Sequence, residues 1–356
     1  MTVDLTGGTL VGVMAGDAGT VTLNVDDAAG VMADKDAGTG KTVTASGYLL
    51  EGADKDNYVL SQPTGLTVDV AKAQLTVEGV TTEDRVYNKL RDQDISGGTL
   101  SDGVVSGDVV VLSVDNAQGK FDDKNAGVNK PVTVSGFAIT GSGAKNYQLV
   151  QPDYLTATVS KLDVTIGGVG ITGTSREYNG LTSIDGLFGG EVVGKLDGDS
   201  ISPDWQNAKG EFDSKNVGIR TVTITGYALQ GSAAVNYNLV QQPGPLSYEI
   251  TPKRLTVTGA VVADRVYDGT LDAKLLSIET LDGVVADDVG DVAVDVEASK
   301  AVFTRKDAGN ALASITYALT GDEAENYYFA YPDSARAVIE KKELTVTGAS
   351  VANRVY

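Results

Sequence analysis

The feature that most constrains the fold is a segment that recurs along the chain at intervals of about 90 residues. Its clearest copy is L-T-V-T-G-A-V-V-A-D-R-V-Y-D-G at 255–269, and related copies begin at Leu75, Leu162 and Leu344. An Asn-Tyr pair and a glycine that closes a K-[DN]-[AV]-G turn keep the same spacing. The pairs are Asn57-Tyr58, Asn146-Tyr147, Asn236-Tyr237 and Asn326-Tyr327, and the glycines are Gly38, Gly127, Gly218 and Gly309. This self-similarity predicts a tandem array of one module, whose length is typical of an independent domain.

These landmarks divide the chain into four modules and one further piece. We predict a first module at 1–72 without its opening strand, modules at 73–161, 162–253 and 254–342, and the opening strand of a further repeat at 343–356. Two interpretations of the ends stay open. Either the chain is a piece of a longer continuous array, or copies assemble head to tail, with Leu344–Tyr356 of one copy completing the first module of the next.

Alternating apolar and polar residues predict short β-strands in every module. In 73–161 the predicted strands are Leu75–Val80, Arg85–Tyr87, Asp108–Val114, Gly119–Phe121, Pro131–Thr140, Asn146–Val150 and Tyr154–Ser160. Seven short strands in about 90 residues are typical of an immunoglobulin-like β-sandwich, so the expected fold class is all-β. Single helical turns are expected only around Asp34–Asp36 and Gly52–Asp54.

Several apolar and aromatic residues are assigned to the core of these modules. In 73–161 one side of the core is expected to be Val132, Val134 and Phe137, and the facing side Val109, Val111 and Leu149. The recurrent Tyr87, Tyr178 and Tyr267 are expected to pin the first strand of each module to this core. In the Asn-Tyr pairs, we expect the asparagine to bond its own backbone near a turn and the tyrosine to bury its ring.

The junctions between modules contain almost no linker. T-A-T-V-S-K at 156–161 is followed directly by L-D-V-T-I, and the other junctions read I-T-P-K-R-L at 250–255 and V-I-E-K-K-E-L at 338–344. A flexible tether would be rich in Gly and Ser, so we expect strand to run into strand in an extended rod of about 30–40 Å per module. Lys161, Lys253 and Lys342 at the junctions are expected to interrupt edge pairing or to meet carboxylates of the neighbouring module.

Composition argues against several classes of function. The 48 acidic and 28 basic residues give a net charge of −20, which repels nucleic acid and anionic membranes. The chain has neither cysteine nor histidine, and so lacks thiolate ligands and the commonest general base. No segment approaches the roughly 18 apolar residues of a membrane span. We therefore expect no enzyme activity, no catalytic, cofactor-binding or metal site, no nucleic-acid binding and no membrane insertion.

Two patterns resemble ligand-binding motifs. Gly38–Thr42 reads G-T-G-K-T, like the end of a phosphate-binding loop, but Lys35 stands where the first glycine is needed and a strand pattern follows. Acidic pairs could supply oxygen ligands to calcium, although none has EF-hand spacing and solvated carboxylates are the favoured interpretation. Weak calcium binding and a Lys–Asn or Lys–Asp isopeptide crosslink both stay open. The acidic pairs are Asp34/Asp36, Asp54/Asp56, Asp122/Asp123 and Asp287/Asp288.

Taken together, these motifs resemble a known repeat. The signature L-T-V-x-G…R-V-Y-[DN]-G, the D-K-N-A-G-type turn and the close N-Y-x-L-x-Q-P…T-A-T-V are similar to the YDG repeat of large secreted bacterial exoproteins and filamentous-haemagglutinin-like adhesins. The resemblance covers nearly the whole chain, with local departures at Asn88-Lys89 and Glu177. It implies stalk material outside the cell or at the bacterial cell surface, in the setting of cell adhesion and biofilm.

Three classes of function are compatible with these observations to different degrees. A structural stalk or fibre is favoured by the repeats and the short junctions, and its partners would be copies of itself or flanking repeats, head to tail. A repeat array that binds a glycan, host or matrix ligand is the alternative, for which only Trp205 and the cluster Tyr327–Tyr331 offer exposed rings. An enzyme with a carboxylate pair ranks last, because no module carries a convergent catalytic set.

Overall fold

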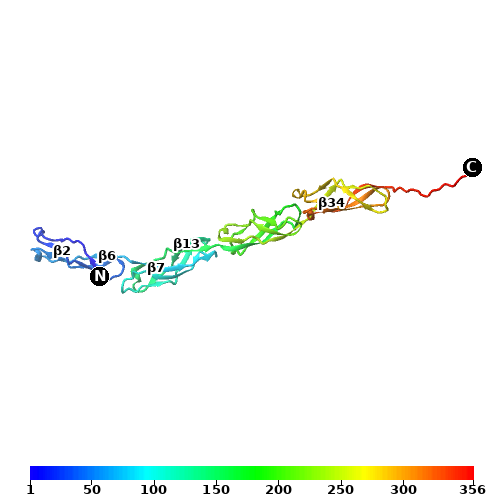
Figure 1. Cartoon of the computed structure of the whole chain (residues 1–356). Helices are drawn as coiled ribbons and strands as arrows, with labels where there is room; N and C mark the ends of the chain where they lie inside the picture. Colours follow the sequence, from blue (N-terminus) through cyan, green and yellow to red (C-terminus); the bar gives the residue numbers. More distant parts are fainter. The chain divides into compact units, whose positions relative to one another are not determined.

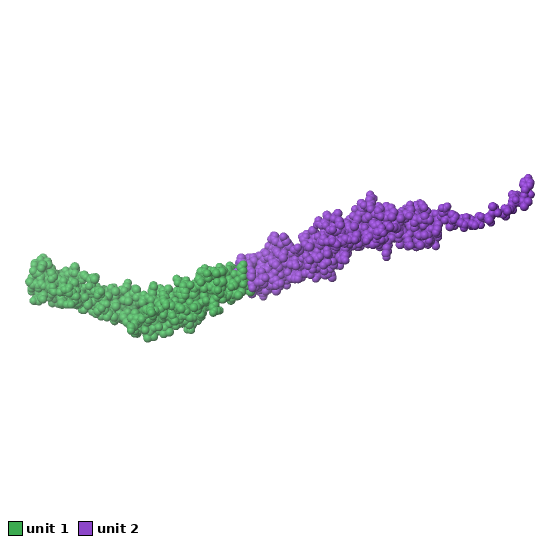
Figure 2. Space-filling model, viewed as in Figure 1, with its two compact units in different colours: residues 1–162 green, residues 163–356 purple.

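The computed structural model describes all residues from 1 to 356. The chain consists of β-strands and five single-turn 3-10 helices, with no α-helix, so the all-β class is confirmed. No helix is long and apolar enough to cross a bilayer. The chain divides into two compact units, residues 1–162 and 163–356 (Figure 2). Modules 1 and 2, numbered along the chain, make up the first unit, and modules 3 and 4 the second (Figure 1).

Module 2 consists of two larger sheets and one short strand pair. The first sheet has the order β8 (Arg85–Val86), β16 (Thr156–Ser160), β13 (Gly127–Ser135), β12 (Gln118–Phe121) and β9 (Asp92–Gln93). The second has the order β10 (Ile95–Leu100), β7 (Ala73–Thr82) and β15 (Tyr147–Val150). The pair is β11 (Val111–Ser113) with β14 (Ala138–Thr140). The opening strand β7 is therefore central, antiparallel to β10 and parallel to β15.

Module 3 repeats this arrangement strand for strand. Its first sheet is β18 (Ser175–Glu177), β26 (Leu246–Thr251), β23 (Gly218–Thr225), β22 (Lys209–Phe212) and β19 (Ser183–Ile184). Its second sheet is β20 (Leu187–Val193), β17 (Leu162–Ile171) and β25 (Tyr237–Gln241). The short pair is β21 (Ser202–Asp204) with β24 (Ala228–Gln230). One core cluster joins residues of both sheets, such as Ile166 with Ile224 and Ile250, so the two sheets pack face to face.

Modules 1 and 4 depart from this plan. Module 1 has a four-stranded sheet, β1 (Thr2–Asp4), β3 (Ala29–Met32), β4 (Gly38–Ser46) and β6 (Leu66–Val70), and the pair β2 (Thr22–Asn24) with β5 (Leu49–Glu51). The main sheet of module 4 is β30 (Arg265–Val266), β37 (Asp333–Glu340), β35 (Gly309–Thr320), β34 (Ala293–Phe303) and β31 (Asp272–Ala273). Its second layer is three separate pairs: β27 (Lys253–Arg254) with β36 (Tyr327–Tyr328), β28 (Thr256–Thr258) with β33 (Thr280–Asp282), and β29 (Val261–Val262) with β32 (Leu275–Ser277). Residues 341–356, expected to contain an opening strand, form no strand and are exposed.

With one exception, the 3-10 turns lie at the same point in each module. Four of them end on the asparagine of an Asn-Tyr pair: η1 (Lys55–Asn57), η2 (Ala144–Asn146), η3 (Ala234–Asn236) and η5 (Ala324–Asn326). The fifth, η4 (Ala286–Asp288), ends on a buried aspartate. The helical turn expected at Gly52–Asp54 lies just after it, at η1, and the one expected at Asp34–Asp36 is wrong. There the Asp34 carboxylate accepts the backbone N–H of Asp36 at 2.8 Å, which closes a turn without a helix.

Two strand predictions for module 2 need correction. The expected single strand Pro131–Thr140 is interrupted at Gly136, which has φ of 88°. A Cβ there would lie 1.8 Å from a backbone oxygen, so only glycine fits, and the chain leaves the first sheet to pair as β14 with β11. The strands β9 and β10 were not predicted: β9 has only two residues, too few to show an alternation, and the Gly-Gly in β10 obscures the alternation there.

The predicted core of module 2 is half right. Val132, Val134 and Phe137 are buried, as expected. Val109 and Val111 are 57% and 55% exposed, so their assignment to the core is wrong. The inward side chains are those of Val110 and Leu112, one position along, because a shift of one residue in a strand moves every side chain to the other face.

Candidate functional site at the module junctions

Within each unit, the chain passes from one module to the next with almost no linker. In the first unit, β6 and β7 are separated by two residues, Ala71 and Lys72. In the second unit, β26 and β27 are separated by Pro252 alone. Proline fixes its own φ and restricts the residue before it, so this connection has few backbone conformations. The junctions are therefore places where side-chain contacts can fix one module against the next.

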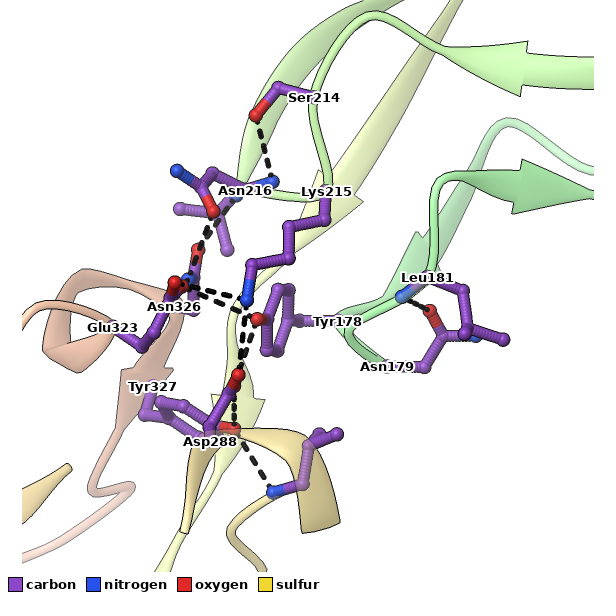
Figure 3. Close-up of polar contacts among 12 residues, drawn as sticks. Tyr178, Asn179, Leu181, Ser214, Lys215, Asn216, Asp288, Glu323, Asn326 and Tyr327 are labelled. Carbon is purple, nitrogen blue, oxygen red and sulfur yellow. Dashed lines mark hydrogen bonds and ion pairs between the residues drawn. The ribbon is translucent and has the colours of Figure 1, made fainter. Parts of the chain in front are cut away.

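A buried carboxylate, Asp288, organises the junction of modules 3 and 4 (Figure 3). Its Oδ2 accepts hydrogen bonds from the hydroxyls of Tyr327, at 2.6 Å, and Tyr178, at 2.8 Å. Its Oδ1 lies 3.1 Å from Nζ of Lys215. Tyr178 and Lys215 belong to module 3, whereas Tyr327 and Asp288 belong to module 4, so one carboxylate joins the two modules. Its side chain is 0% exposed.

A second group of contacts surrounds Asn326 at the same junction (Figure 3). Its Oδ1 accepts the backbone N–H of Val217 at 3.0 Å, and its Nδ2 donates to Oδ1 of Asn216 at 3.3 Å. Nδ2 also donates to Oε2 of Glu323 at 2.7 Å, while Oε1 of Glu323 lies 3.0 Å from Nζ of Lys215. Lys215 therefore lies between two carboxylates of module 4, and the asparagine ties both modules through its amide.

Local structure places each of these side chains. Tyr178 directly follows β18, and its N–H donates to the carbonyl oxygen of Thr251 at 2.8 Å, which orients the ring toward the junction. Lys215 lies in the turn between β22 and β23, where Ser214 Oγ accepts the N–H of Asn216. The rings of Tyr178 and Tyr327 meet edge to face, with centroids 5.4 Å apart and planes at 77°. Such pairs add about 0.5–1.5 kcal/mol beyond the area that they bury.

The charges at this junction stabilise one another. Burial alone would raise the pKa of Asp288, but hydrogen bonds from Tyr327, Tyr178 and Lys215 outweigh it and hold that pKa below its usual value. The hydrogen bond to Glu323 is the main reason that the pKa of Lys215 is raised. Burial acts in the opposite direction, and the bond to Asp288 raises this pKa further. Burial and the bond to Asp288 raise the pKa of Tyr327 to about 12. Near neutral pH the set therefore holds a carboxylate, an ammonium group and two neutral phenols.

The junction of modules 1 and 2 repeats these contacts at the same sequence separations. Nζ of Lys35 lies 2.5 Å from Oδ1 of Asp108, 73 residues later, as Lys215 does with Asp288. The N–H of Ala37 donates at 2.9 Å to Oδ1 of Asn146, 109 residues later, as Val217 does with Asn326. Asp108 also accepts the hydroxyl of Tyr147 at 3.0 Å. The same contacts thus form in both units, each independently of the other.

The junction of modules 1 and 2 adds an ion pair of its own. Nζ of Lys145 lies 2.5 Å from Oδ2 of Asp36, and Nδ2 of Asn146 donates to Oδ1 of the same carboxylate at 3.1 Å. The hydrogen bond with Lys145 is the main reason that the pKa of Asp36 is lowered. Asn216 holds the corresponding position in the other unit, where the amide takes the place of the carboxylate.

The Asn-Tyr pair requires a correction. We expected the asparagine to bond its own backbone, yet Asn146 and Asn326 accept an N–H from the preceding module. The tyrosine rings of Tyr147, Tyr237 and Tyr327 are buried, as expected. Their hydroxyls each donate to an aspartate 38 or 39 residues earlier, a role that was not predicted. An aspartate 38 to 41 residues before the tyrosine of each pair is the sequence signal that could have revealed it, with Asp17 before Tyr58 at the longest separation.

The other candidate residues lie in strands, in ion pairs or at the module junctions. The phosphate-loop-like Gly38–Thr42 lies in strand β4, and its lysine, Lys41, pairs with Asp34. No group of three or more acidic side chains is placed to hold a metal ion. Lys253 was predicted as the last residue of module 3, but the structure places it in β27 of module 4, where it pairs with Glu177 of module 3 at 3.1 Å. Lys161 and Lys342 are exposed. Tyr87 and Tyr178 are buried and Tyr267 is half-buried.

Comparison with known proteins agrees with the repeat pattern. The YDG domain matches residues 1–65, 71–157, 160–244 and 251–335. Neither the curated proteins nor the solved structures gave a match. The four matched stretches span most of the chain, and each contains an Asn-Tyr pair whose tyrosine bonds to an aspartate. The chain therefore belongs to the YDG domain family, with four copies of the domain in tandem.

Proposed function

We propose that this chain is a structural stalk or fibre-forming region of a bacterial exoprotein, a filamentous-haemagglutinin-like adhesin, displayed outside the cell or at the cell surface. In this proposal each YDG module is an immunoglobulin-like β-sandwich that acts as a spacer. The proposed function lies in holding neighbouring modules in a fixed orientation.

The junction contacts are the observation that carries the proposal. The Lys–Asp–Tyr and Asn–backbone contacts recur in both units at separations of 73 and 109 residues. A binding array would need only that its modules are linked, whereas a stalk needs each link to resist bending. Hydrogen-bonded charge pairs around a buried aspartate side chain suit this role because their geometry is specific, even where their net contribution to stability is modest.

Spin labels can test the stiffness on which the proposal depends. The chain has no cysteine, so Lys209→Cys and Lys300→Cys place two labels on exposed positions of modules 3 and 4. We expect a narrow distance distribution by pulsed electron resonance, which broadens when Asp288→Ala is added. Small-angle scattering of the whole chain should give a maximum dimension well over 100 Å, from about 30–40 Å per module. A broad distribution in the parent, or a globular scattering curve, would refute the stalk.

Head-to-tail contact between YDG chains is part of the same proposal. Module 1 has two hollows of about 390 and 480 Å³, lined among others by Leu5, Val43, Leu50 and Leu60. In module 2 the equivalent space holds β7, whose Leu75 and Val77 are 0% and 2% exposed. An L-T-V-x-G strand from a flanking repeat or a second copy would bury the same residues and pair its backbone on both sides.

Light scattering tests this contact. The segment Leu344–Tyr356 carries the L-T-V-T-G pattern, and its Leu344 and Val346 are 87% and 89% exposed. At high concentration the chain should form heterologous oligomers that grow in length. Leu344→Asp should abolish them, and a free peptide of residues 344–356 should cap them. A chain that stays monomeric at high concentration would exclude strand donation.

A further inference from the structure

Module 4 differs from the other modules at one set of linked positions. In modules 1 to 3 a glutamine in the Q-P sequence clamps the backbone of an aromatic residue through two hydrogen bonds. Gln151, for example, accepts the N–H of Phe137 at 3.1 Å and donates to its carbonyl oxygen at 2.9 Å. The equivalent pairs are Gln62 with Tyr48 and Gln242 with Tyr227. In module 4 the corresponding position is Tyr331, which cannot form this pair of bonds and is 80% exposed.

The strand beside this position also changes. The positive-φ glycine that interrupts the strand in modules 1 to 3 is replaced by Thr316, so β35 runs unbroken from Gly309 to Thr320. Tyr317, at the aromatic position, now turns its hydroxyl to Oδ2 of Asp333, at 2.8 Å, and packs on Phe329 with ring centroids 5.1 Å apart. Burial and the Asp333 bond raise the pKa of Tyr317, which keeps the phenol neutral.

These changes open the second layer of the module. In module 2 the opening strand pairs with the Asn-Tyr strand over four residues, from Tyr147 to Val150. In module 4 the pairing covers only Tyr327 and Tyr328, after which the two strands separate. Two adjoining hollows of about 460 and 190 Å³ lie at this point, and five residues line both. The shared residues are Tyr317, Phe329, Ala330, Tyr331 and Pro332.

We propose that these hollows form a binding site for a neutral oligosaccharide. The larger one has the size of a small-ligand pocket, typically about 300–1,000 Å³. A pyranose ring has an apolar C–H face, which stacks on tyrosine, and a rim of hydroxyls, which bond to carboxylates and phenols. Tyr331 and Tyr328 supply exposed faces, at 80% and 44%, while Glu325, Asp333 and Arg254 supply polar groups at the edge.

The charge of the site selects against acidic sugars. Two carboxylates, Glu325 and Asp333, line the hollows with a single cation, Arg254, on a chain of net charge −20. An anionic ligand would meet net repulsion, whereas neutral hydroxyls bond equally well to all three groups. The exposed pair Tyr328 and Tyr331 belongs to module 4 alone, because in modules 1 to 3 the position of Tyr331 is held by the clamping glutamine. It does not rest on the stalk proposal.

Titration with defined trisaccharides tests the site. Maltotriose, cellotriose and tri-N-acetylchitotriose are titrated into the whole chain by calorimetry, with sialyllactose as the acidic probe. We expect at least one neutral trisaccharide to bind and sialyllactose to fail. Tyr331→Gln, which installs the residue that modules 1 to 3 carry, should weaken binding at least about tenfold, the effect of a lost aromatic contact. Trp205→Ala, at an exposed ring of module 3, should leave binding unchanged, with thermal melts showing that both variants fold.

Four results would overturn this assignment, three of them from the sugars and the Tyr331 variant. These three are no binding by any neutral trisaccharide, binding that survives Tyr331→Gln, and stronger binding of sialyllactose than of the neutral sugars. Loss of binding in the Trp205→Ala variant would also contradict it, since that ring belongs to a different module.

Discussion

Asp288→Ala removes the carboxylate that joins modules 3 and 4. The change leaves the hydroxyl of Tyr327 without its acceptor and leaves that of Tyr178 only the longer contact with Oε2 of Glu323, at 3.5 Å. It also takes one of two carboxylates from Lys215. Breaking a buried charge pair by removing one partner typically costs about 3–5 kcal/mol. Lys215 is 32% exposed and keeps Glu323, so solvent screening reduces the ionic part. We expect a loss of about 3 kcal/mol, roughly half of it from contacts that cross the junction.

The single tryptophan makes the cross-junction part measurable. Trp205 lies in module 3, whereas Asp288 lies in module 4, so tryptophan fluorescence follows the unfolding of the module that is not mutated. With a urea dependence of about 1–3 kcal/mol per molar for a small domain, a cross-junction loss of about 1.5 kcal/mol lowers the Trp205 midpoint by about 0.5–1.5 M. Hydrogen exchange of module 4 peptides measures the remaining loss of stability, which falls within module 4 itself.

Asp287→Ala is the matched control. It removes the same charge at the neighbouring, exposed position and should leave the Trp205 midpoint within about 0.2 M of the parent. If Asp288→Ala destabilises module 4 and leaves the Trp205 transition where it was, the carboxylate acts only within its own module. The junction would then not couple the two modules, and the reasoning from its contacts would be wrong.

Three other substitutions test the packing. Tyr267→Ala should destabilise module 4 by about 2–3 kcal/mol in calorimetry while the other modules melt as before, and no effect would make the ring a surface feature. Gly136→Ala should destabilise module 2 by more than about 2 kcal/mol, because the new Cβ meets a backbone oxygen, whereas Gly19→Ala, in open space, should be neutral in the same melts. Gln242→Ala should cost module 3 about 2 kcal/mol through its two lost backbone bonds, measured from the Trp205 midpoint.

The all-β class and the repeat were predictable because both depend on local patterns. Alternation gives strands, and recurrence of the same residues gives the period. The errors lie where the pattern is locally ambiguous. Val109 and Val111 belong to a run of valines in which both faces look apolar, so the register could not be chosen. The break at Gly136 depends on a contact with a backbone oxygen from a distant turn, which no local pattern contains.

The junction site was predictable only in part. Recurrence correctly indicated that the Asn-Tyr pair and the tyrosine of R-V-Y are structural. It could not show that Asn326 and Tyr178 act across a junction, because a residue that serves the contact between modules recurs with the same period as one that serves the core. The distinction requires knowing which end of the module each side chain occupies. Tyr178 is an example, with its ring in the core of its own module and its hydroxyl on Asp288 of the next.

The pH dependence of the junction follows from these pKa shifts. Asp288 has a lowered pKa, so its contribution is present above the unfolded value of about 3.9 and is lost as the pH falls through the folded value. Tyr327, with a pKa raised to about 12, and Lys215, also raised, contribute fully below their unfolded values of about 10. The Trp205 midpoint should therefore be flat from about pH 5 to 9 and fall on both sides.

Because other carboxylates also titrate in acid, the comparison is between Asp287→Asn and Asp288→Asn, and only the second should flatten the acid limb. Burial and the bond to Asp288 also raise the pKa of Tyr178, so Tyr178→Phe should flatten part of the alkaline limb and leave the acid limb. The opposite assignment of limbs would show that the wrong groups titrate at the junction.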